Sequence, residues 1–136
     1  MDLGLQGKKA IVAGASRGIG KAIAIDLARE GVDMAIVSRS QADLDKTAQE
    51  IRDETGRLII PMALDVTRRD QVDRVVAEAA GQLGGLHILV NSASLPGGSP
   101  TGPIDTVVDD DLISDFNVKY VGALRMSRAA IPFLKE

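Results

Sequence analysis

The chain has 136 residues, the length of a single domain, and its 45% apolar and 26% charged residues are ordinary globular values that exclude wholesale disorder. Sixteen Lys and Arg against nineteen Asp and Glu give a net charge of -3, which argues against a protein built to wrap nucleic acid. Cysteine is absent and His87 is the one histidine, so disulfides, thiolate metal sites, cysteine nucleophiles and multi-histidine metal centres are excluded.

The first residues do not resemble a targeting segment. Residues 1–5 include Asp2 and contain no apolar run, unlike a secretory signal. No apolar stretch of the sequence approaches the ~20 residues that span a bilayer. We therefore expect a cytoplasmic protein that binds neither a membrane nor nucleic acid and holds no metal.

Strand and helix patterns then alternate along the chain. Short apolar runs indicate buried strands, whereas apolar residues spaced three and four apart indicate helices. In chain order the prediction is a strand at 8–13, a helix at 19–30, a strand at 34–37, a helix from Ser40 to about Thr55, a strand at 58–64, a helix with apolar residues from Val72 to Leu83, a strand at 86–90 and a long last helix.

Capping residues mark several of the helix ends. Ser40 with Asp43, and Thr67 with Asp70, have the spacing of a capping box at a helix start. Gly31 stands where a helix C-terminal glycine belongs. These signals place the second helix after Ser40 and the third after Thr67.

Apolar residues at helical spacing mark the first and the last helix. In the first helix these are Ile19, Ala22, Ile23 and Leu27, and in the last they are Phe116, Tyr120, Leu124, Ile131 and Leu134. A loop rich in Gly and Pro at 96–103 precedes the last helix. The run Asp109 to Asp111 predicts a solvated helix start, where carboxylates suit the helix dipole.

The order of elements predicts an α/β fold. Strands that are apolar on both faces and separated by helices imply a parallel sheet covered on both sides. Pro61 lies inside the third strand, which places that strand at an edge of the sheet. We predict a doubly wound, Rossmann-like parallel sheet: residues 1–136 form a dinucleotide-binding domain, truncated after its fourth strand–helix unit and incomplete at the C-terminus.

A glycine-rich turn between the first strand and the first helix is the strongest functional signal. Gly14, Gly18 and Gly20 fit the pattern G-x-x-x-G-x-G. Gly14 lets the chain turn off the strand, and the missing side chains of Gly18 and Gly20 let a pyrophosphate approach the backbone before Ile19 at the helix N-terminus. Ser16 adds a hydroxyl donor. A tight turn without a ligand is the alternative, but it does not require three glycines.

This turn, followed by Asp65-Val66, Asn91-Ser92-Ala93-Ser94 and Asn117, resembles the motifs of the short-chain dehydrogenase/reductase family in order and spacing, over essentially the whole chain. The resemblance implies a nucleotide-binding fold and an oxidoreductase that transfers hydride between a nicotinamide cofactor and an alcohol or carbonyl substrate. It also implies a homo-oligomer, because in this family the last helix present here and its missing partner commonly form the dimer interface.

The resemblance implies a role for each matching residue. Asp65 would hydrogen-bond the adenine amino group, with the backbone of Val66 beside it; a plain turn residue is the alternative for Asp65. Asn91 would brace the central strand, and Ala93 would pass beside the cofactor ribose. Ser94 stands where the family usually has Gly, which adds bulk near the cofactor.

The end of the second strand distinguishes NADP from NAD. NAD-binding proteins carry an Asp or Glu there for the ribose 2′-hydroxyl, but this chain has Ser38 and Arg39. Arg39 can form a bidentate pair with a 2′-phosphate, Ser38 can donate a hydroxyl, and Arg17 adds a second positive charge. We therefore predict NADP rather than NAD. The alternative for both arginines is a solvated surface position.

The family's catalytic set is only partly present. Asn117 matches an Asn that holds a water in the proton relay, and is the one catalytic residue that the resemblance implies here. Tyr120 is followed four residues later by Leu124, not by the Lys of the family's Tyr-x-x-x-Lys motif, so we expect it to pack within the helix. His87 is predicted to be a structural residue at a strand end.

Two explanations of the missing residues stay open. If the chain belongs to a longer protein, that protein is an NADP-dependent oxidoreductase; if it ends at Glu136, no turnover is expected, because the proton donor is missing. A non-catalytic NADP-binding protein or a truncated remnant is the alternative function. A phosphoryl receiver domain lacks support, because the acidic pair it needs after the first strand is replaced by Gly14 to Ser16.

Overall fold

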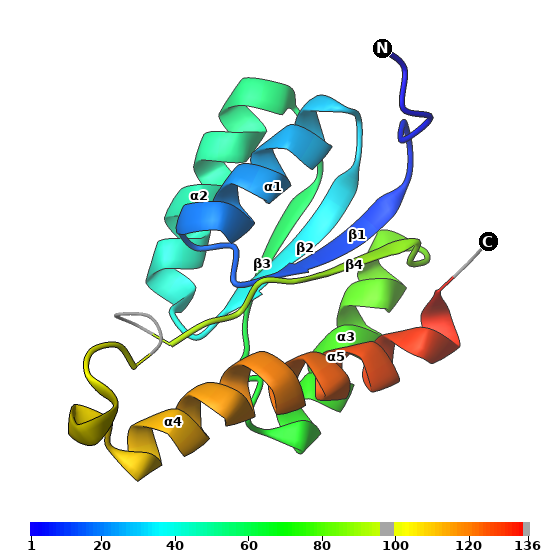
Figure 1. Ribbon diagram of the computed structural model, residues 1–136. Helices are drawn as coiled ribbons and strands as arrows, with labels where there is room; N and C mark the ends of the chain where they lie inside the picture. The colour runs from blue at the N-terminus through cyan, green and yellow to red at the C-terminus, as the bar shows by residue number, and fades with distance from the viewer. Residues whose placement is uncertain (96–99, 135–136) are drawn as a thin grey trace.

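The computed structural model describes residues 1–95 and 100–134 and contains one parallel sheet (Figure 1). The sheet order is β3-β2-β1-β4, with β1 at Lys9–Ala13, β2 at Asp33–Ser38, β3 at Ile59–Ala63 and β4 at Ile88–Asn91. The predicted doubly wound parallel sheet is confirmed. The third strand lies at an edge, as Pro61 indicated, and β4 forms the other edge of the described sheet.

Helices cover both faces of this sheet. Figure 1 shows α1 and α2 on one face and α3 and α5 on the other. The helices are α1 (Gly18–Arg29), α2 (Gln41–Thr55), α3 (Arg69–Leu83), α4 (Asp109–Phe116) and α5 (Gly122–Ala130). Because successive strand residues point to opposite faces, Ala10 and Val12 of β1 join the core under α1 and α2, whereas Ile11 and Ala13 join the core under α3 and α5.

The predicted N-cap at Ser40 is confirmed by one of the two hydrogen bonds of a capping box. The Oγ of Ser40 accepts the backbone N–H of Asp43 at 3.3 Å at the start of α2. The prediction for Thr67 is wrong: its backbone N–H and hydroxyl donate to Oδ1 of Asp65 at 2.9 and 2.7 Å. A turn at the end of β3 thus uses the Thr67 hydroxyl, and α3 begins after Arg68 without a side-chain cap.

The apolar residues that marked α1 in the sequence are not the residues that its inner face buries. Ile19 is 76% exposed, and the residues of α1 that are buried are Gly20, Ala24 and Ala28. These small residues stand at a spacing of four, so they form a smooth stripe on which the helix approaches the sheet closely. The larger residues Ile23 and Leu27 lie beside that stripe and are half-buried.

The last helical segment is divided and turned differently from the prediction. The aspartates do start α4 as predicted, but a π-helical turn, η2 (Asn117–Val121), separates α4 from α5, and a 3₁₀ turn, η3 (Ile131–Phe133), follows. The five apolar residues that marked one long helix in the sequence are exposed: Phe116, Tyr120, Leu124, Ile131 and Leu134. The buried residues of η2 and α5 are instead Val118, Gly122, Met126 and Ala130.

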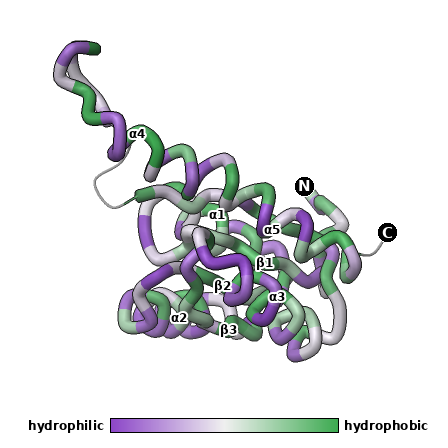
Figure 2. Tube along the Cα trace, turned by 90° about the horizontal axis from the view of Figure 1, so that it is seen from below, coloured by the Kyte–Doolittle hydropathy of each residue, from purple (hydrophilic) through white to green (hydrophobic). Residues whose placement is uncertain are grey.

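An apolar surface therefore runs along the outside of α4, η2 and α5. Tyr120 does not pack into the core; its ring stacks on that of Phe116, with ring centroids 4.9 Å apart. Figure 2 shows α4 projecting away from the rest of the chain. Residues 96–99 of the predicted Gly- and Pro-rich loop lie outside the described residues, and 104–106 form the 3₁₀ turn η1 (Ile104–Thr106).

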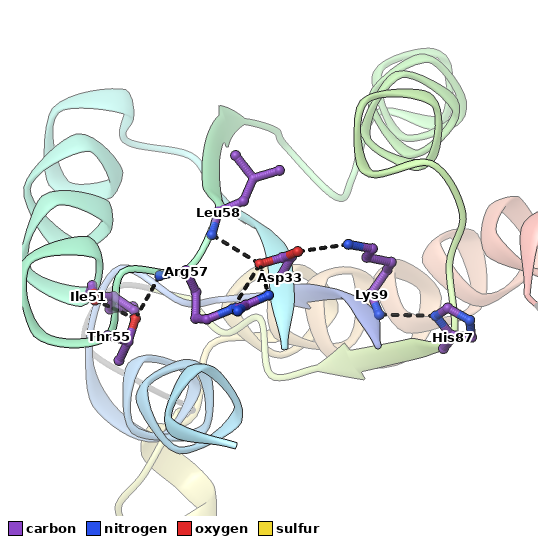
Figure 3. A network of polar contacts seen from close by, with 7 residues as sticks. All are labelled: Lys9, Asp33, Ile51, Thr55, Arg57, Leu58 and His87. Atoms are coloured by element: carbon purple, nitrogen blue, oxygen red, sulfur yellow. Dashed lines mark hydrogen bonds and ion pairs between the residues drawn. The ribbon is translucent and has the colours of Figure 1, made fainter. Parts of the chain in front are cut away.

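A charged network closes the amino ends of the strands (Figure 3). Asp33 accepts from Nζ of Lys9 at 2.7 Å, from Nε of Arg57 at 3.0 Å and from the backbone N–H of Leu58 at 3.1 Å. Beside it, Nδ1 of His87 accepts the backbone N–H of Lys9 at 3.0 Å, which confirms the structural position predicted for this histidine. Burial raises the pKa of Asp33, but these donors and their charges outweigh burial and hold that pKa below its ordinary value.

We expect Asp33 to make the stability of the protein dependent on acid pH. A carboxyl whose pKa is lowered in the folded state contributes stability above its unfolded pKa and loses that contribution as pH falls through the folded pKa. At neutral pH, Asp33→Asn should lower the free energy of unfolding by about 1–3 kcal/mol. The free energy of unfolding of this variant should also fall less steeply than that of the unmodified protein as the pH is lowered. Urea unfolding between about pH 7 and pH 3 checks this. Asp105→Asn, at an exposed position, is the control and should leave the decline unchanged.

Candidate functional site

One crevice lies along the carboxyl ends of the four strands. Its volume is about 1030 Å³, and segments that follow β1, β2, β3 and β4 all line it. In open parallel sheets this is the edge where ligands collect. The crevice is therefore where a ligand is expected.

The residues predicted to contact a cofactor meet at this crevice. All twelve line it: Gly14, Ser16, Arg17, Gly18, Ile19, Gly20, Ser38, Arg39, Asp65, Val66, Asn91 and Ala93. They come from four separate segments of the chain, and the parallel sheet brings these segments to one edge.

The three glycines of the turn meet different structural demands. Gly14 has φ +80°, and a Cβ there would overlap the backbone of Ser92, so β1 and the segment after β4 approach as closely as a glycine allows. A Cβ on Gly20 would overlap the carbonyl group of Gly14, which makes Gly20 a packing residue of the turn itself. Gly18 has φ +61°, and a Cβ there would meet nothing within 4 Å. Gly18 thus leaves the backbone of the turn open to the crevice.

The N-terminus of α1 points its backbone donors at this open side. The first turn of the helix contains no acidic residue, and Arg17 at the N-cap makes no side-chain hydrogen bond to the helix. The turn is fixed by α2, because the hydroxyl of Thr47 donates to the carbonyl oxygen of Ser16 at 3.1 Å. Unpaired N–H groups and the helix dipole together favour an anion at this place.

The end of β2 contributes a polar atom without a partner. The Oγ of Ser38 is buried and makes no hydrogen bond within the described chain, although Ser38 lines the crevice. A buried hydroxyl of this kind costs free energy unless a ligand or water satisfies it. Arg39 follows directly with an exposed side chain, and Asp43 in the first turn of α2 lines the same crevice.

Asp65 is both a turn residue and a crevice residue. Burial raises its pKa, but the hydrogen bonds from the hydroxyl and N–H of Thr67, with the charges of Arg39 and Arg68, outweigh burial and lower the pKa below its ordinary value. The turn that was the alternative reading of Asp65 is therefore present. Asp65 also stays an ionised acceptor at the wall of the crevice.

The end of β4 joins the sheet to the last helix. Nδ2 of Asn91 donates to Oγ of Ser127 in α5 at 3.2 Å, and Asn91 pairs with Ala13 of β1 in the sheet register. Beyond Asn91 the chain continues along the crevice wall, where Ser92 and Ser94 both line it.

Asn117 is not among the residues that line the crevice. Its Oδ1 accepts from Nη2 of Arg125 at 2.9 Å, and its backbone oxygen accepts from Nη1 of the same arginine at 3.4 Å. Nη1 of Arg125 also donates to the carbonyl oxygen of Val66 at 3.0 Å. Arg125 thus ties η2 to the segment after β3, a link that the sequence pattern did not indicate.

Two residues of η2 that were not predicted do line the crevice, Val118 and Lys119. Lys119 lies 3.5 Å from Oδ1 of the buried Asp115, one helical turn earlier. A signal for this arrangement existed in the sequence: Val118, Gly122, Met126 and Ala130 stand at a strict spacing of four. That spacing identifies the inner face of the segment better than its larger apolar residues do.

Among the residues that the structure describes, no group of three or more His, Asp or Glu side chains is placed to hold a metal ion. Within residues 1–95 and 100–134, no helix has the length and apolar character that crossing a bilayer requires.

The sequence is similar to a family profile described as short chain dehydrogenase, which matches residues 8–136. Among individual proteins, hydroxysteroid dehydrogenase-like protein 2 of Mus musculus is 36% identical over 139 aligned residues, covering 97% of this chain. Short chain dehydrogenase MYCFIDRAFT_6125 of Pseudocercospora fijiensis is 35% identical over 136 residues. This chain covers 28% and 42% of the length of those two proteins.

Solved structures of similar fold include proteins with either nicotinamide cofactor. A short chain dehydrogenase from Burkholderia cenocepacia in complex with NADP is 37% identical, with a TM-score of 0.86 over 97% of this chain and 53% of its own. L-sorbose reductase from Gluconobacter frateurii, complexed with NADPH and L-sorbose, is 31% identical with a TM-score of 0.85 over 97% of this chain and 49% of its own. A xylitol dehydrogenase bound to NAD⁺ is 26% identical with a TM-score of 0.88, over 95% of this chain and 48% of its own.

Proposed function

Because the chain belongs to the short chain dehydrogenase family, we propose that it binds NADP in the crevice and serves a reaction that interconverts an alcohol and a carbonyl by hydride transfer. One observation carries the proposal: an open glycine turn and the buried Ser38 hydroxyl, which has no partner among the described residues, line the same crevice at neighbouring strands. The chain spans about half or less of the length of the relatives named above, so the activity is proposed for the protein that contains it.

The pyrophosphate of the cofactor is proposed to lie at the N-terminus of α1. Gly18 leaves the backbone accessible there, no acidic side chain occupies the first turn, and Arg17 adds a positive charge beside it. These features supply the donors and the charge that a pyrophosphate requires.

The 2′-phosphate of NADP is proposed to lie at the end of β2. The Oγ of Ser38 would donate to it, and Arg39 would form the bidentate pair that guanidinium makes with phosphate. Asp43 and the ionised Asp65 also line the crevice and oppose an anion, whereas Arg17, Arg39 and Lys119 line it with positive charge. The balance of charge supports NADP over NAD.

The remaining half of the cofactor is proposed to follow the end of β4, past Asn91 and Ala93. A bound nicotinamide would supply the hydride. Asp65 and Val66 would contact the adenine, and Asn117, held by Arg125, would hold a water for the proton relay.

The reaction also needs a proton donor, and residues 1–136 contain no Tyr-x-x-x-Lys sequence. A non-catalytic NADP-binding protein is therefore the second candidate function.

A homo-oligomer is proposed as well, in a cytoplasmic protein. The support is the apolar surface along α4, η2 and α5, which includes Phe116, Tyr120 and Leu124, each more than half exposed. Large exposed apolar patches of this kind mark interaction sites in soluble proteins.

Calorimetric titration with NADPH and NADH tests the proposed function. We expect NADPH to bind at least about tenfold more tightly than NADH, because only NADPH offers the phosphate that Arg39 and Ser38 can hold. Failure to bind either dinucleotide would contradict the proposal. If NADPH binds, the intact mass of the protein and an activity screen on carbonyl compounds separate an enzyme from a binding protein.

A further inference from the structure

One peptide unit at the wall of the crevice is hydrogen-bonded at both of its ends. It joins Val66 to Thr67, directly after Asp65. Its carbonyl oxygen accepts from Nη1 of Arg125 in α5 at 3.0 Å. Its N–H donates to Oδ1 of Asp65 at 2.9 Å. Because the C=O and N–H of one peptide unit lie in a single plane, the direction of one fixes the direction of the other. Arg125 is therefore connected to the carboxylate of Asp65 through this plane.

The guanidinium of Arg125 is itself fixed from its other side. Nη2 donates to Oδ1 of Asn117 at 2.9 Å, and Nη1 donates to the backbone oxygen of the same residue at 3.4 Å. The helix that carries Arg125 also lies close to Val66, because a Cβ on Gly122 would be 2.8 Å from Cγ2 of Val66. A planar guanidinium with bonds to two groups has little freedom to turn. The carbonyl group of Val66 thus meets a donor of fixed direction.

Loss of Arg125 would affect this peptide unit more than the rest of the segment. Among the described residues, no other donor is bonded to the carbonyl oxygen of Val66, and Val66 is only 7% exposed. A buried carbonyl without a partner costs free energy, so the peptide would rotate toward water and carry its N–H away from Asp65. The backbone of Asp65 would stay in place, because its N–H donates to Oε1 of Gln71 at 3.2 Å and its oxygen accepts from the N–H of Arg68 at 3.0 Å.

We infer that Arg125 is a positioning residue that directs the carboxylate of Asp65 at the base of the bound cofactor, and that it thereby sets the preference of the crevice for adenine. This inference rests on the proposed function, in which Asp65 contacts the adenine. Oδ1 of Asp65 holds both hydrogen bonds from Thr67, which leaves Oδ2 to accept from the adenine amino group. A carboxylate attracts an amino group and repels a carbonyl oxygen, so its direction decides between bases that differ there.

The reduced hypoxanthine analogue of NADPH is the probe for this inference. It differs from NADPH only in its base, where a carbonyl oxygen and an N1–H replace the amino group and the bare N1 of adenine. We expect the unmodified protein to bind this analogue at least about tenfold more weakly than NADPH. The measured quantity is the ratio of the Kd for the analogue to the Kd for NADPH. A merely structural role of Arg125 would change both constants by one factor and leave their ratio unchanged.

Two substitutions of Arg125 should lower this ratio by different amounts. Arg125→Met removes every donor, and the ratio should fall to less than about threefold. Arg125→Lys keeps the charge but not the planar fork that reaches both Val66 and Asn117, so its ratio should fall by at least about twofold and stay above that of Arg125→Met. If Arg125→Met does not fold, Arg125→Lys carries the test. Arg128→Met makes the same change of side chain at an exposed position of α5 and should leave the ratio unchanged.

A double variant tests whether Arg125 acts through Asp65. Asp65→Asn removes the charge of the acceptor and should by itself abolish most of the preference for adenine. If Arg125 acts only by directing this carboxylate, adding Arg125→Met to Asp65→Asn should not change the ratio further. Isothermal titration calorimetry measures the dissociation constants of all variants, and thermal unfolding shows which of them are folded.

The outcomes separate this inference from the proposed function. A ratio that falls in the Arg125 variants, but not in Arg128→Met, supports the inference. It is overturned, while NADP binding stands, if the ratio is unchanged in the Arg125 variants or falls further in the double variant than in Asp65→Asn. It is also overturned if the unmodified protein binds NADPH and the analogue equally well. If the unmodified protein binds neither, the proposed function fails and the inference fails with it.

Discussion

Gly14→Ala is expected to abolish NADPH binding and to lower the free energy of unfolding by at least about 3 kcal/mol. Gly14 has φ +80°, a conformation that alanine adopts only with strain, and the added Cβ would overlap the carbonyl group of Ser92 and the nitrogen of Ala93. Both neighbours are backbone atoms, so β1 and the segment after β4 would have to separate. That movement would open the turn on which the pyrophosphate is proposed to lie.

Two alanine substitutions serve as comparisons for Gly14→Ala. Gly81 lies in α3 with open space around it and an ordinary backbone angle, so Gly81→Ala should raise stability by about 0.5–1 kcal/mol and leave binding unchanged. Gly18→Ala adds strain at φ +61°, but its Cβ meets no atom of the described residues within 4 Å. Its effect on the free energy of unfolding should therefore lie between the effects of the other two substitutions. Urea unfolding and NADPH titration measure both effects. If Gly14→Ala behaves like Gly81→Ala, the close approach at Ser92 is not a constraint on the protein.

Arg39→Asp is expected to weaken NADPH binding by about 100-fold and to change NADH binding by less than about threefold. The loss combines a charge-assisted hydrogen bond, worth about 1.5–3 kcal/mol, with new repulsion between a carboxylate and the phosphate. NADH has no phosphate on that ribose, and a carboxylate at the end of β2 can accept a hydrogen bond from its 2′-hydroxyl. The substitution should therefore narrow or reverse the preference between the two cofactors.

Competition titrations with NADPH and NADH measure the effect of Arg39→Asp. Arg74→Asp makes the same charge change on the exposed side of α3, away from the crevice, and should leave both affinities unchanged apart from a small salt-dependent effect. Equal losses for NADPH and NADH in Arg39→Asp would mean that Arg39 supports the crevice without contacting a phosphate, and the choice of NADP would be wrong.

The third helix illustrates when a sequence pattern is sufficient. Six of its apolar residues follow helical spacing over three turns, and all six are buried in α3: Val72, Val75, Val76, Ala79, Ala80 and Leu83. An apolar face of this length can be buried in only one orientation of the helix against the sheet. The strands were also predicted, because their apolar runs are short and bounded by turn residues; β1 and β2 are almost wholly buried, whereas β3 and β4 are mostly half-buried.

The helices at the two ends of the crevice illustrate when the pattern misleads. In α1 and α5, small residues such as Ala24 and Gly122 lie inward, and larger ones such as Ile19 and Leu124 lie outward. Close approach to the sheet selects small side chains, whereas a hydrophobicity pattern assigns the larger ones to the core. Lys119 was missed in the same way, because the last helix was recognised from its larger apolar residues, such as Phe116 and Tyr120.

The amino-acid sequence alone determined the order of strands and helices, the glycine turn and the replacement of an acid by Ser38 and Arg39, because these are local patterns. Only the tertiary structure decided that a Cβ on Gly20 would overlap Gly14, and that the buried hydroxyl of Ser38 has no partner in the described part of the chain. It also decided that Lys119 lines the crevice while Asn117 is held by Arg125. Each of these depends on how closely segments distant in the chain approach one another, and that distance is set by packing across the whole sheet.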